Sequence, residues 1–345
     1  MKNILIIALA LSLCIGESIA QKKKKGPTSV GEKQINFKGG YGQKKLKKAP
    51  KKIYISKFNV YFNVIATATA KTTGGRTVGG GSVRAGTSTT MTVGVDGVDV
   101  PDFQAITDNA YARFIKEFES RGYEFLSTEE ASKAKYYEGW EMKEGGNVNY
   151  ANIPGYVSVT PTGTKYMIKK QNRKGKEKTT ALNMNNTMIL SGQLEDVLVA
   201  QVTLAFPCID MSAKGGVYAT TSKVSANVNY RMGTAFGQEG MQSNFAPSQM
   251  VILSGKGPGL TSDAYFYSSL KEPIYSGESV FKNTEFKERT YGGTSPAYYG
   301  IVFQDNESSK VTHSTEADKD VYISESNRLI DEFMDISFEE FWSYH

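Results

Sequence analysis

Runs of residues that alternate between apolar and polar side chains constrain the fold of this 345-residue chain more than any other feature. Residues 52–70 alternate in this way, which predicts one long strand, or two strands joined at Lys57-Phe58. Residues 197–206 are apolar on both faces, a pattern typical of a buried central strand. The 20 tyrosines and 17 phenylalanines also favour β structure. The sequence therefore predicts a β-rich protein.

Each of these runs is followed by glycines and then by a second strand-like run. A glycine-rich stretch at 71–87 leads to strand-like residues 90–95, which predicts a hairpin around 58–95. Gly215-Gly216 leads to a second alternating run at 217–230, which predicts a hairpin around 197–230. The glycines at 79–81 do not match a nucleotide-binding loop, because no helix follows them directly.

The clearest helix is predicted between Pro101 and Gly122. Its apolar residues are spaced three or four apart and so share one helix face: Phe103, Ile106, Ala110, Phe114 and Phe118. Asp102 is the expected cap at its start and Gly122 the expected stop. A short strand is predicted at 123–126.

Two further helices are predicted from capping and periodicity. The pattern Ser127-x-x-Glu130 is a capping box that starts a helix towards Tyr137. Residues 322–334 carry an apolar helical face, and Ser337-x-x-Glu340 predicts a separate last turn. The predicted fold class is α+β: a β-rich mixed sheet with two or three packing helices and long β-hairpins.

The first twenty residues have the pattern of a signal peptide. Lys2 precedes an apolar run at 4–15, and Ser18-Ile19-Ala20 forms a small-x-small cleavage site before Gln21. The alternatives are a buried N-terminal helix and a lipoprotein signal with Cys14 as the lipid-bearing residue. Because leucine precedes Cys14 where a small residue is required, the cleaved form is favoured, and the protein is expected to be exported.

Charge divides the chain into two parts. The net charge is +6, but residues 21–57 carry thirteen lysines against Glu32 alone, so residues 58–345 are net acidic. We expect a basic disordered arm at 21–51, because it has few apolar side chains to bury. The expected partners of the lysines between Lys22 and Lys52 are envelope proteins or an acidic surface, of lipid headgroups or glycan, and not nucleic acid. A homo-oligomer is left open.

The remaining boundaries follow from the order of these elements. Residues 52–206 are predicted to form an α/β-type layer domain. Residues 207–345 are predicted to be a β-rich continuation that ends in an acidic helix. The sequence leaves open whether the two parts form one domain.

Residues 52–206 resemble the periplasmic domain of the curli-secretion channel family and related flagellar-assembly lipoproteins. The resemblance is carried by the sequences IYISKF at 53–58, ITDNA at 106–110, RGYEFL at 121–126 and ILSG at 189–192. In the family pattern the last of these lies in a strand before a long β-segment. The resemblance implies roles in protein interaction and carries no catalytic residues over.

A search for catalytic and ligand-binding motifs yields no predicted catalytic, cofactor or metal site. Residues 293–297 lack the final glycine of a nucleophile elbow. Cys208 lies in an apolar run and is expected to be buried, so a nucleophilic pair with His313 or His345 is disfavoured.

Two acidic clusters have plain structural explanations. Glu138 and Glu141 beside Trp140 fit a sugar-cleaving pair only on a helix, so an exposed acidic turn with a half-buried tryptophan is favoured. Asp318, Asp320 and Glu325 lack calcium-loop spacing and fit the acidic start of a helix.

The function expected from the sequence is that of an exported, non-enzymatic assembly or binding protein at the bacterial envelope, on the periplasmic side of the outer membrane. One alternative is a secreted or surface adhesion or glycan-binding β protein, indicated by a tyrosine-rich stretch: Tyr265, Tyr267, Tyr275, Tyr291, Tyr298 and Tyr299. A second is a membrane-inserting pore subunit, although the apolar face of the first hairpin shrinks to alanine towards its tip. A third is a hydrolase of unrecognised type.

Overall fold

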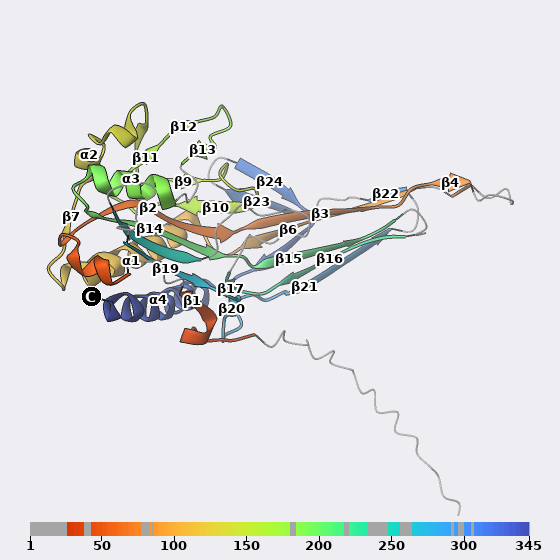
Figure 1. Cartoon of the computed structure of the whole chain (residues 1–345). Helices are drawn as coiled ribbons and strands as arrows, with labels where there is room; N and C mark the ends of the chain where they lie inside the picture. The colour runs from red at the N-terminus through yellow and green to blue at the C-terminus, as the bar shows by residue number, and fades with distance from the viewer. Residues whose placement is uncertain are drawn as a thin grey trace, which may run out of the picture.

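The computed structural model describes residues 26–37, 43–76, 83–84, 86–179, 184–216, 221–233, 248–255, 264–290, 293–295, 300–304 and 307–344. The predicted signal segment, Cys14, the glycines at 79–81 and His345 lie outside these residues. The described chain is an α+β protein, as predicted, with several mixed sheets and a few helices (Figure 1).

An eight-stranded sheet forms the centre of the body. Its neighbouring strands are, in order, β1 (Ile35–Phe37), β19 (Ala264–Leu270), β18 (Gln249–Ser254), β14 (Leu198–Phe206), β2 (Lys52–Asn63), β10 (Tyr156–Val159) and β9 (Val148–Asn149), and β7 (Glu124–Phe125) pairs with β2. β14 runs parallel to β2 and antiparallel to β18. Every residue of β14 is buried, which confirms the predicted central strand.

Two helices, α1 (Val100–Glu119) and α4 (Lys319–Ser343), cover one face of this sheet (Figure 1). The predicted apolar face of α1 is buried as expected. Phe118 packs against Phe338 and Phe341 of α4, with ring centroids 6.0 and 5.7 Å apart. These rings, together with Phe62 and Phe206 from the sheet, form the main core.

Both helices differ in detail from the predicted capping. α1 begins after Asp99, whose backbone amide donates a hydrogen bond to the Asp102 carboxylate (2.8 Å), so Asp102 lies in the first turn. α4 is one helix of 25 residues, and the predicted cap Ser337 is buried within it. The Ser337 hydroxyl instead hydrogen-bonds Ser268 of β19 (2.5 Å). Ser337 therefore links α4 to the sheet, whereas its spacing from Glu340 had predicted the start of a separate helical turn.

A thinner layer covers part of the opposite sheet face. It contains α2 (Thr128–Ala131), η3 (Lys135–Tyr137), α3 (Met184–Gln193), the ladder of β8 (Glu141–Glu144) with β11 (Lys165–Ile168), and the hairpin of β12 (Lys170–Gln171) with β13 (Glu177–Lys178). The capping box of Ser127 and Glu130 is confirmed at the start of α2. The expected strand at 189–192 is wrong, because these residues lie in α3. There, Leu190 packs inward beneath the layer.

Beyond the body, two further sheets face each other and project as a sandwich (Figure 1). One contains β3 (Ile65–Lys71), β6 (Thr87–Asp96), β22 (Gly293–Ser295) and β25 (His313–Glu316), and the other contains β15 (Ile209–Lys214), β16 (Ser222–Val228) and β21 (Glu285–Thr290). Small ladders join β4 (Gly75–Arg76) to β5 (Val83–Arg84), β17 (Arg231–Met232) to β20 (Ile274–Tyr275), and β23 (Gly300–Gln304) to β24 (Glu307–Val311). Between the two facing sheets, the Thr89 hydroxyl bonds Ser222 (2.7 Å) and Thr290 (2.8 Å).

The first predicted hairpin is confirmed as the pair β3 and β6, although the break after β2 falls at Val64 and not at Lys57-Phe58. The second prediction is right about the turn at Gly215-Gly216 but wrong about the first strand of the hairpin, because the described residues 222–228 do not pair with β14. β16 pairs with β15, which begins only after Pro207-Cys208. Proline lacks the amide that a continuing strand would donate, so the chain leaves the central sheet at this point.

The described part of the predicted basic arm does not behave as a disordered leader. β1 pairs with β19 at the edge of the central sheet. Val30, Ile35 and Leu46 are buried, and Leu46 has no exposed surface. The expectation of disorder at 21–51 therefore fails for residues 26–37 and 43–50. The apolar side chains described in this segment, Val30, Ile35, Phe37 and Leu46, pack against the body, which the average composition of the segment does not show.

The core also crosses the proposed boundary at 206/207. β2 and β14 precede that boundary, whereas β18, β19 and α4 follow it, and all contribute to one sheet and one apolar cluster. Among the described residues, no helix has both the length and the apolarity of a membrane span. The same residues contain no His, Cys, Asp and Glu cluster suited to a metal ion.

Candidate functional site: a polar cavity on the sheet

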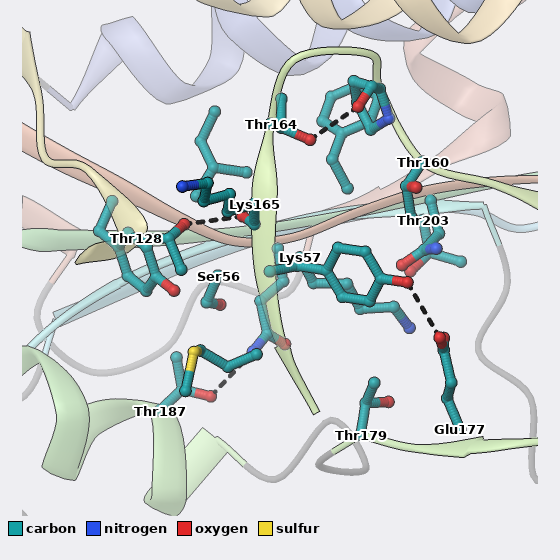
Figure 2. Close-up of a pocket in the computed structure, with 18 of the residues that line it drawn as sticks. Ser56, Lys57, Thr128, Thr160, Thr164, Lys165, Glu177, Thr179, Thr187 and Thr203 are labelled. Carbon is teal, nitrogen blue, oxygen red and sulfur yellow. Dashed lines mark hydrogen bonds between the residues drawn. The ribbon is translucent and has the colours of Figure 1, made fainter. Parts of the chain in front are cut away.

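A cavity of about 1190 Å³ lies between the central sheet and the thin covering layer (Figure 2). Its floor is the face of β2, β14, β18 and β19 that points away from α1 and α4. Its walls come from η3, β11, the β12–β13 hairpin and α3. A space of this size is at the upper end of what small-molecule sites in proteins occupy.

The floor of the cavity is polar at its centre. Strand register places Asn59 of β2 beside Thr203 of β14, and Thr203 opposite Gln249 of β18. Two residues earlier on both strands, Lys57 lies beside Gln201. The opposite face of the same strands is mostly apolar, with Ser268 as an exception, so the sheet keeps one largely apolar face for the helices and a face with a polar centre for the cavity.

A β-bulge brings Lys57 to this face. Along β2, Ile53 and Ile55 point towards the helices, and strict alternation would send Lys57 in the same direction. The register with β14 shifts between Ala200 and Gln201, so that Ile55 pairs with Ala200 and Lys57 with Gln201. Ser56 is the extra residue, and an extra residue reverses the direction of the side chains that follow it.

Several buried polar atoms in the floor and walls have no hydrogen-bond partner among the described residues. They are Oγ1 of Thr203, Nε2 of Gln249 and Oγ1 of Thr160. The three side chains are 2%, 2% and 6% exposed, respectively. They show that this face of the sheet is built from polar side chains, whereas the face beneath the helices is mostly apolar.

The cavity also holds a lysine without a carboxylate partner. Lys57 is half-buried, and its ammonium lies 6.0 Å from the centre of the Tyr61 ring. No ion pair joins Lys57 to a carboxylate in the part of the chain that the structure describes. Lys165, by contrast, is held by Glu129 at 2.7 Å and Glu144 at 3.6 Å.

Aromatic side chains form much of the walls. Trp140 and Tyr136 lie side by side with ring centroids 5.4 Å apart, and Tyr54 and Tyr137 share a hydrogen bond of 3.3 Å. The Tyr166 hydroxyl donates to Glu177 (2.9 Å), as Figure 2 shows. Burial raises the pKa of Tyr137 and of Tyr166 above the ordinary tyrosine value, so both rings stay neutral.

The β12–β13 hairpin beside the cavity is strongly basic. The positive side chains of residues 169–178 are all exposed: Lys169, Lys170, Arg173, Lys174, Lys176 and Lys178. Glu177 is the acidic residue among them, and it bonds Tyr166 and Asn152. The hairpin therefore gives this side of the cavity a positive potential.

The tyrosine-rich stretch is only partly brought to the cavity. Tyr265 and Tyr267 project from β19 into it. Tyr275 lies in β20, with the Arg231 guanidinium 5.9 Å from its ring. The tyrosines at 291, 298 and 299 lie outside the described residues.

The two acidic clusters have the plain structures expected of them. Glu138 and Glu141 are exposed and Trp140 is half-buried, so only the tryptophan faces the cavity. Asp318 caps α4 by accepting a hydrogen bond from the Val321 amide (3.2 Å), and Asp320 lies in the first turn.

Cys208 is buried, as predicted. Its thiol donates to the Asn63 carbonyl oxygen (3.1 Å), and burial raises the pKa of the thiol to about 12. A thiol held in this way stays protonated and is a poor nucleophile. His313 is paired with Glu288 in the projecting sandwich.

Sequence reasoning missed the residues of the cavity floor. Gln201 and Thr203 stand two apart within a strand that is otherwise apolar, and therefore lie on one face. That spacing was the available signal for a polar face in a buried strand. Lys57 could not be assigned to the same face without knowledge of the bulge.

No family model, curated protein or solved structure matches the chain. The resemblance to the curli-secretion domain therefore stays a prediction, and the function is argued from the cavity.

Proposed function

We propose that the protein is an exported, non-enzymatic binding protein of the bacterial envelope, which holds a ligand in the cavity between the central sheet and its covering layer. The observation that carries this proposal is a large cavity whose floor is polar at the centre of a buried sheet. A sheet face that served packing alone would be expected to be apolar there, like the face beneath α1 and α4.

The side chains that face the cavity support ligand binding. Lys57, Asn59 and Thr164 are half-buried and line it, above a floor that carries Thr203 and Gln249. A ligand with donors and acceptors can hydrogen-bond the half-buried groups when it binds, so the site is arranged for a polar or amphipathic molecule.

The outer faces of the projecting sandwich favour a binding role over a membrane-inserting pore subunit. Thr67 and Thr69 are exposed on β3, and Lys223 and Lys287 are exposed on the other sheet. A lipid-facing strand requires an apolar outer face. The sandwich turns its alanine, valine and methionine side chains inward instead.

Ligand capture tests the cavity. The purified protein is incubated with an envelope extract and washed, and the released compounds are identified by mass spectrometry. We expect Thr203→Phe, which fills the floor, and Thr164→Trp, which narrows the wall, to lose the captured compound. Thr67→Phe on the sandwich is the matched control and should retain it. Equal capture by all four proteins would contradict a site in the cavity.

Export is tested at the N-terminus. We expect mass spectrometry of the mature protein to find Gln21, or its pyroglutamate form, as the first residue. The reason is the small-x-small site that ends at Ala20. A diacylglyceryl group on Cys14 would instead support the lipoprotein alternative and place the protein on a membrane.

A further inference from the structure

Building on the proposed function, we infer that the ligand of the cavity is an anionic saccharide, whose acidic group binds Lys57 and whose rings stack on the aromatic walls. Three features of the cavity carry the inference: its charge, the hydrogen-bonding groups of its floor and the placement of its rings. Each narrows the chemistry of the ligand independently.

The charged side chains around the cavity favour an anionic ligand. The lining includes five lysines and two glutamates. Glu129 is paired with Lys165 (2.7 Å), whereas Glu177 accepts a hydrogen bond from the neutral Tyr166 hydroxyl (2.9 Å) and keeps its charge. Five lysines against two glutamates leave an excess of three positive charges in the lining. Lys57 is half-buried and forms no ion pair within the described residues, so its ammonium can bind the acidic group of a ligand.

The exposed hairpin beside the cavity favours the same sign of charge. Lys170, Lys176 and Lys178 belong both to this hairpin and to the lining. Like charges gathered at one rim raise the local concentration of anions and speed their association. These three lysines, already counted in the lining, therefore attract an anionic ligand before it reaches Lys57.

The floor distinguishes a saccharide from a fatty acid. An alkyl chain would remove water from the polar side chains that face the cavity, such as Lys57 and Asn59, without giving them hydrogen-bond partners. Sugar hydroxyls both donate and accept, so they match a floor of hydroxyl and amide groups. Figure 2 shows Lys57, Thr160 and Thr203 in the same half of the cavity.

The aromatic walls complete the chemistry. Trp140, Tyr166 and Tyr267 are half-buried and line the cavity from the turn after η3, from β11 and from β19. The flat face of an aromatic ring packs well against the C–H groups on one face of a sugar ring. Rings on several sides of a space of about 1190 Å³ suit a ligand of more than one sugar unit.

The experiment uses Trp140 as its reporter and calorimetry as an independent measure of affinity. The mature protein is titrated with trigalacturonate, with its neutral methyl ester and with mannose 6-phosphate, which separates carboxylate from phosphate. The other tryptophan, Trp342, lies among the helices and donates to Glu117 (2.8 Å). Trp140→Phe should therefore abolish the fluorescence change while calorimetry still detects binding.

Charge variants test the role of Lys57. We expect an acidic sugar to bind, and Lys57→Gln to weaken its binding about tenfold, which corresponds to about 1.4 kcal/mol. Lys57→Arg should largely restore it. Lys223→Gln on the projecting sandwich removes the same charge at an exposed site and should leave the affinity unchanged. Equal melting temperatures show that the variants are folded.

The remaining outcomes separate this inference from the proposed function. Equal binding of trigalacturonate and its methyl ester overturns the anionic ligand and leaves a cavity-binding protein. Equal weakening by Lys57→Gln and Lys223→Gln overturns the role of Lys57. If no acidic sugar binds but the capture experiment yields another compound in the cavity, the saccharide is wrong and the proposed function stands. Failure of both experiments overturns both.

Discussion

At the scale of single residues, Asn63 holds together the point at which the body meets the projecting sandwich. Its side-chain amide donates to the carbonyl oxygens of Ile65 (3.2 Å) and Gly155 (2.9 Å), and its Oδ1 accepts from the Ile209 amide (3.0 Å). β2 and β14 both end here, and β3 and β15 begin. One side chain thus satisfies backbone groups that two departing strands leave unpaired.

Asn63→Ala should lower the free energy of unfolding by about 2–3 kcal/mol, because several buried backbone groups lose their partner at once. Asn59→Ala is the matched control on the same strand. Asn59 is half-buried and makes one long hydrogen bond to Ser158 (3.4 Å), so a loss below about 1 kcal/mol is expected. Urea titration measures both. Equal losses would show that the junction does not depend on Asn63.

Glu325 is the residue whose ionisation is tied most closely to the fold. Arg328 donates two hydrogen bonds to it, each of 2.8 Å, and Ser276 and the Gly277 amide donate two more. The Arg328 guanidinium, followed by Ser276, lowers the pKa of Glu325 to about 2 despite the opposing effect of burial. The charged carboxylate therefore anchors α4 to the loop after β20.

This pKa predicts a loss of stability in acid. The unfolded chain takes up a proton near the ordinary glutamate pKa of about 4.3, whereas the folded protein resists protonation until about pH 2. The contribution of Glu325 is therefore complete at neutral pH and declines as pH falls from about 4.5 to 2. We expect Glu325→Gln to cost about 2 kcal/mol at pH 7 and clearly less at pH 3.

Glu339→Gln is the control for this comparison, since Glu339 is exposed on the same helix. It should change stability little at either pH. Urea unfolding of the parent protein and of both variants at pH 7 and pH 3 gives the change in the free energy of unfolding for each variant at each pH. A cost of Glu325→Gln that does not depend on pH would reject the role of its charge.

At the scale of secondary-structure elements, the N-terminal segment acts as part of the body. Leu46 of η2 (Gln43–Lys48) is fully buried in the main core, and β1 extends the sheet at its β19 edge. Leu46→Ala should therefore cost about 2–4 kcal/mol, the usual penalty for emptying a buried leucine site. Lys47→Ala, at the exposed neighbouring position, should change stability by less than about 0.5 kcal/mol. Thermal unfolding measures the stability change of each variant. If Leu46→Ala left the stability unchanged, the prediction of a disordered arm would be supported after all.

The elements that could be predicted are those whose pattern is local. α1 follows from its apolar spacing, and the start of α2 from its capping box, because both signals lie within one element. α3 could not be predicted at 184–193, since it is fixed by packing against β14 and β18. The cavity depends on register between strands, including the bulge at Ser56, and register is a tertiary property. Composition likewise concealed the buried Leu46 among the lysines.

At the scale of the whole molecule, the central sheet binds the two halves of the sequence together. β14 has β2 on one side, from the first half, and β18 on the other, from the second half. The helix layer is shared in the same way, since Lys319 of α4 pairs with Asp102 of α1 (2.8 Å). A division at 206/207 would expose one edge of β14 and one side of α1.

The fragment of residues 52–206 should therefore fail to fold by itself. Without α4, the fragment loses the rings that cover four of its own core side chains: Phe62, Phe103, Phe114 and Phe118. At about 1.5–3 kcal/mol for each large apolar side chain, this removes about 6–12 kcal/mol. That loss is comparable to the whole stability of a typical domain, about 5–15 kcal/mol.

Urea titration followed by circular dichroism and Trp140 fluorescence should show no cooperative transition for the fragment. The mature chain should show a single transition, coincident by both probes, because its core is continuous from the body into the sandwich. A cooperative transition in the fragment would mean that residues 52–206 are a domain of their own and that the second half was added to a body already complete.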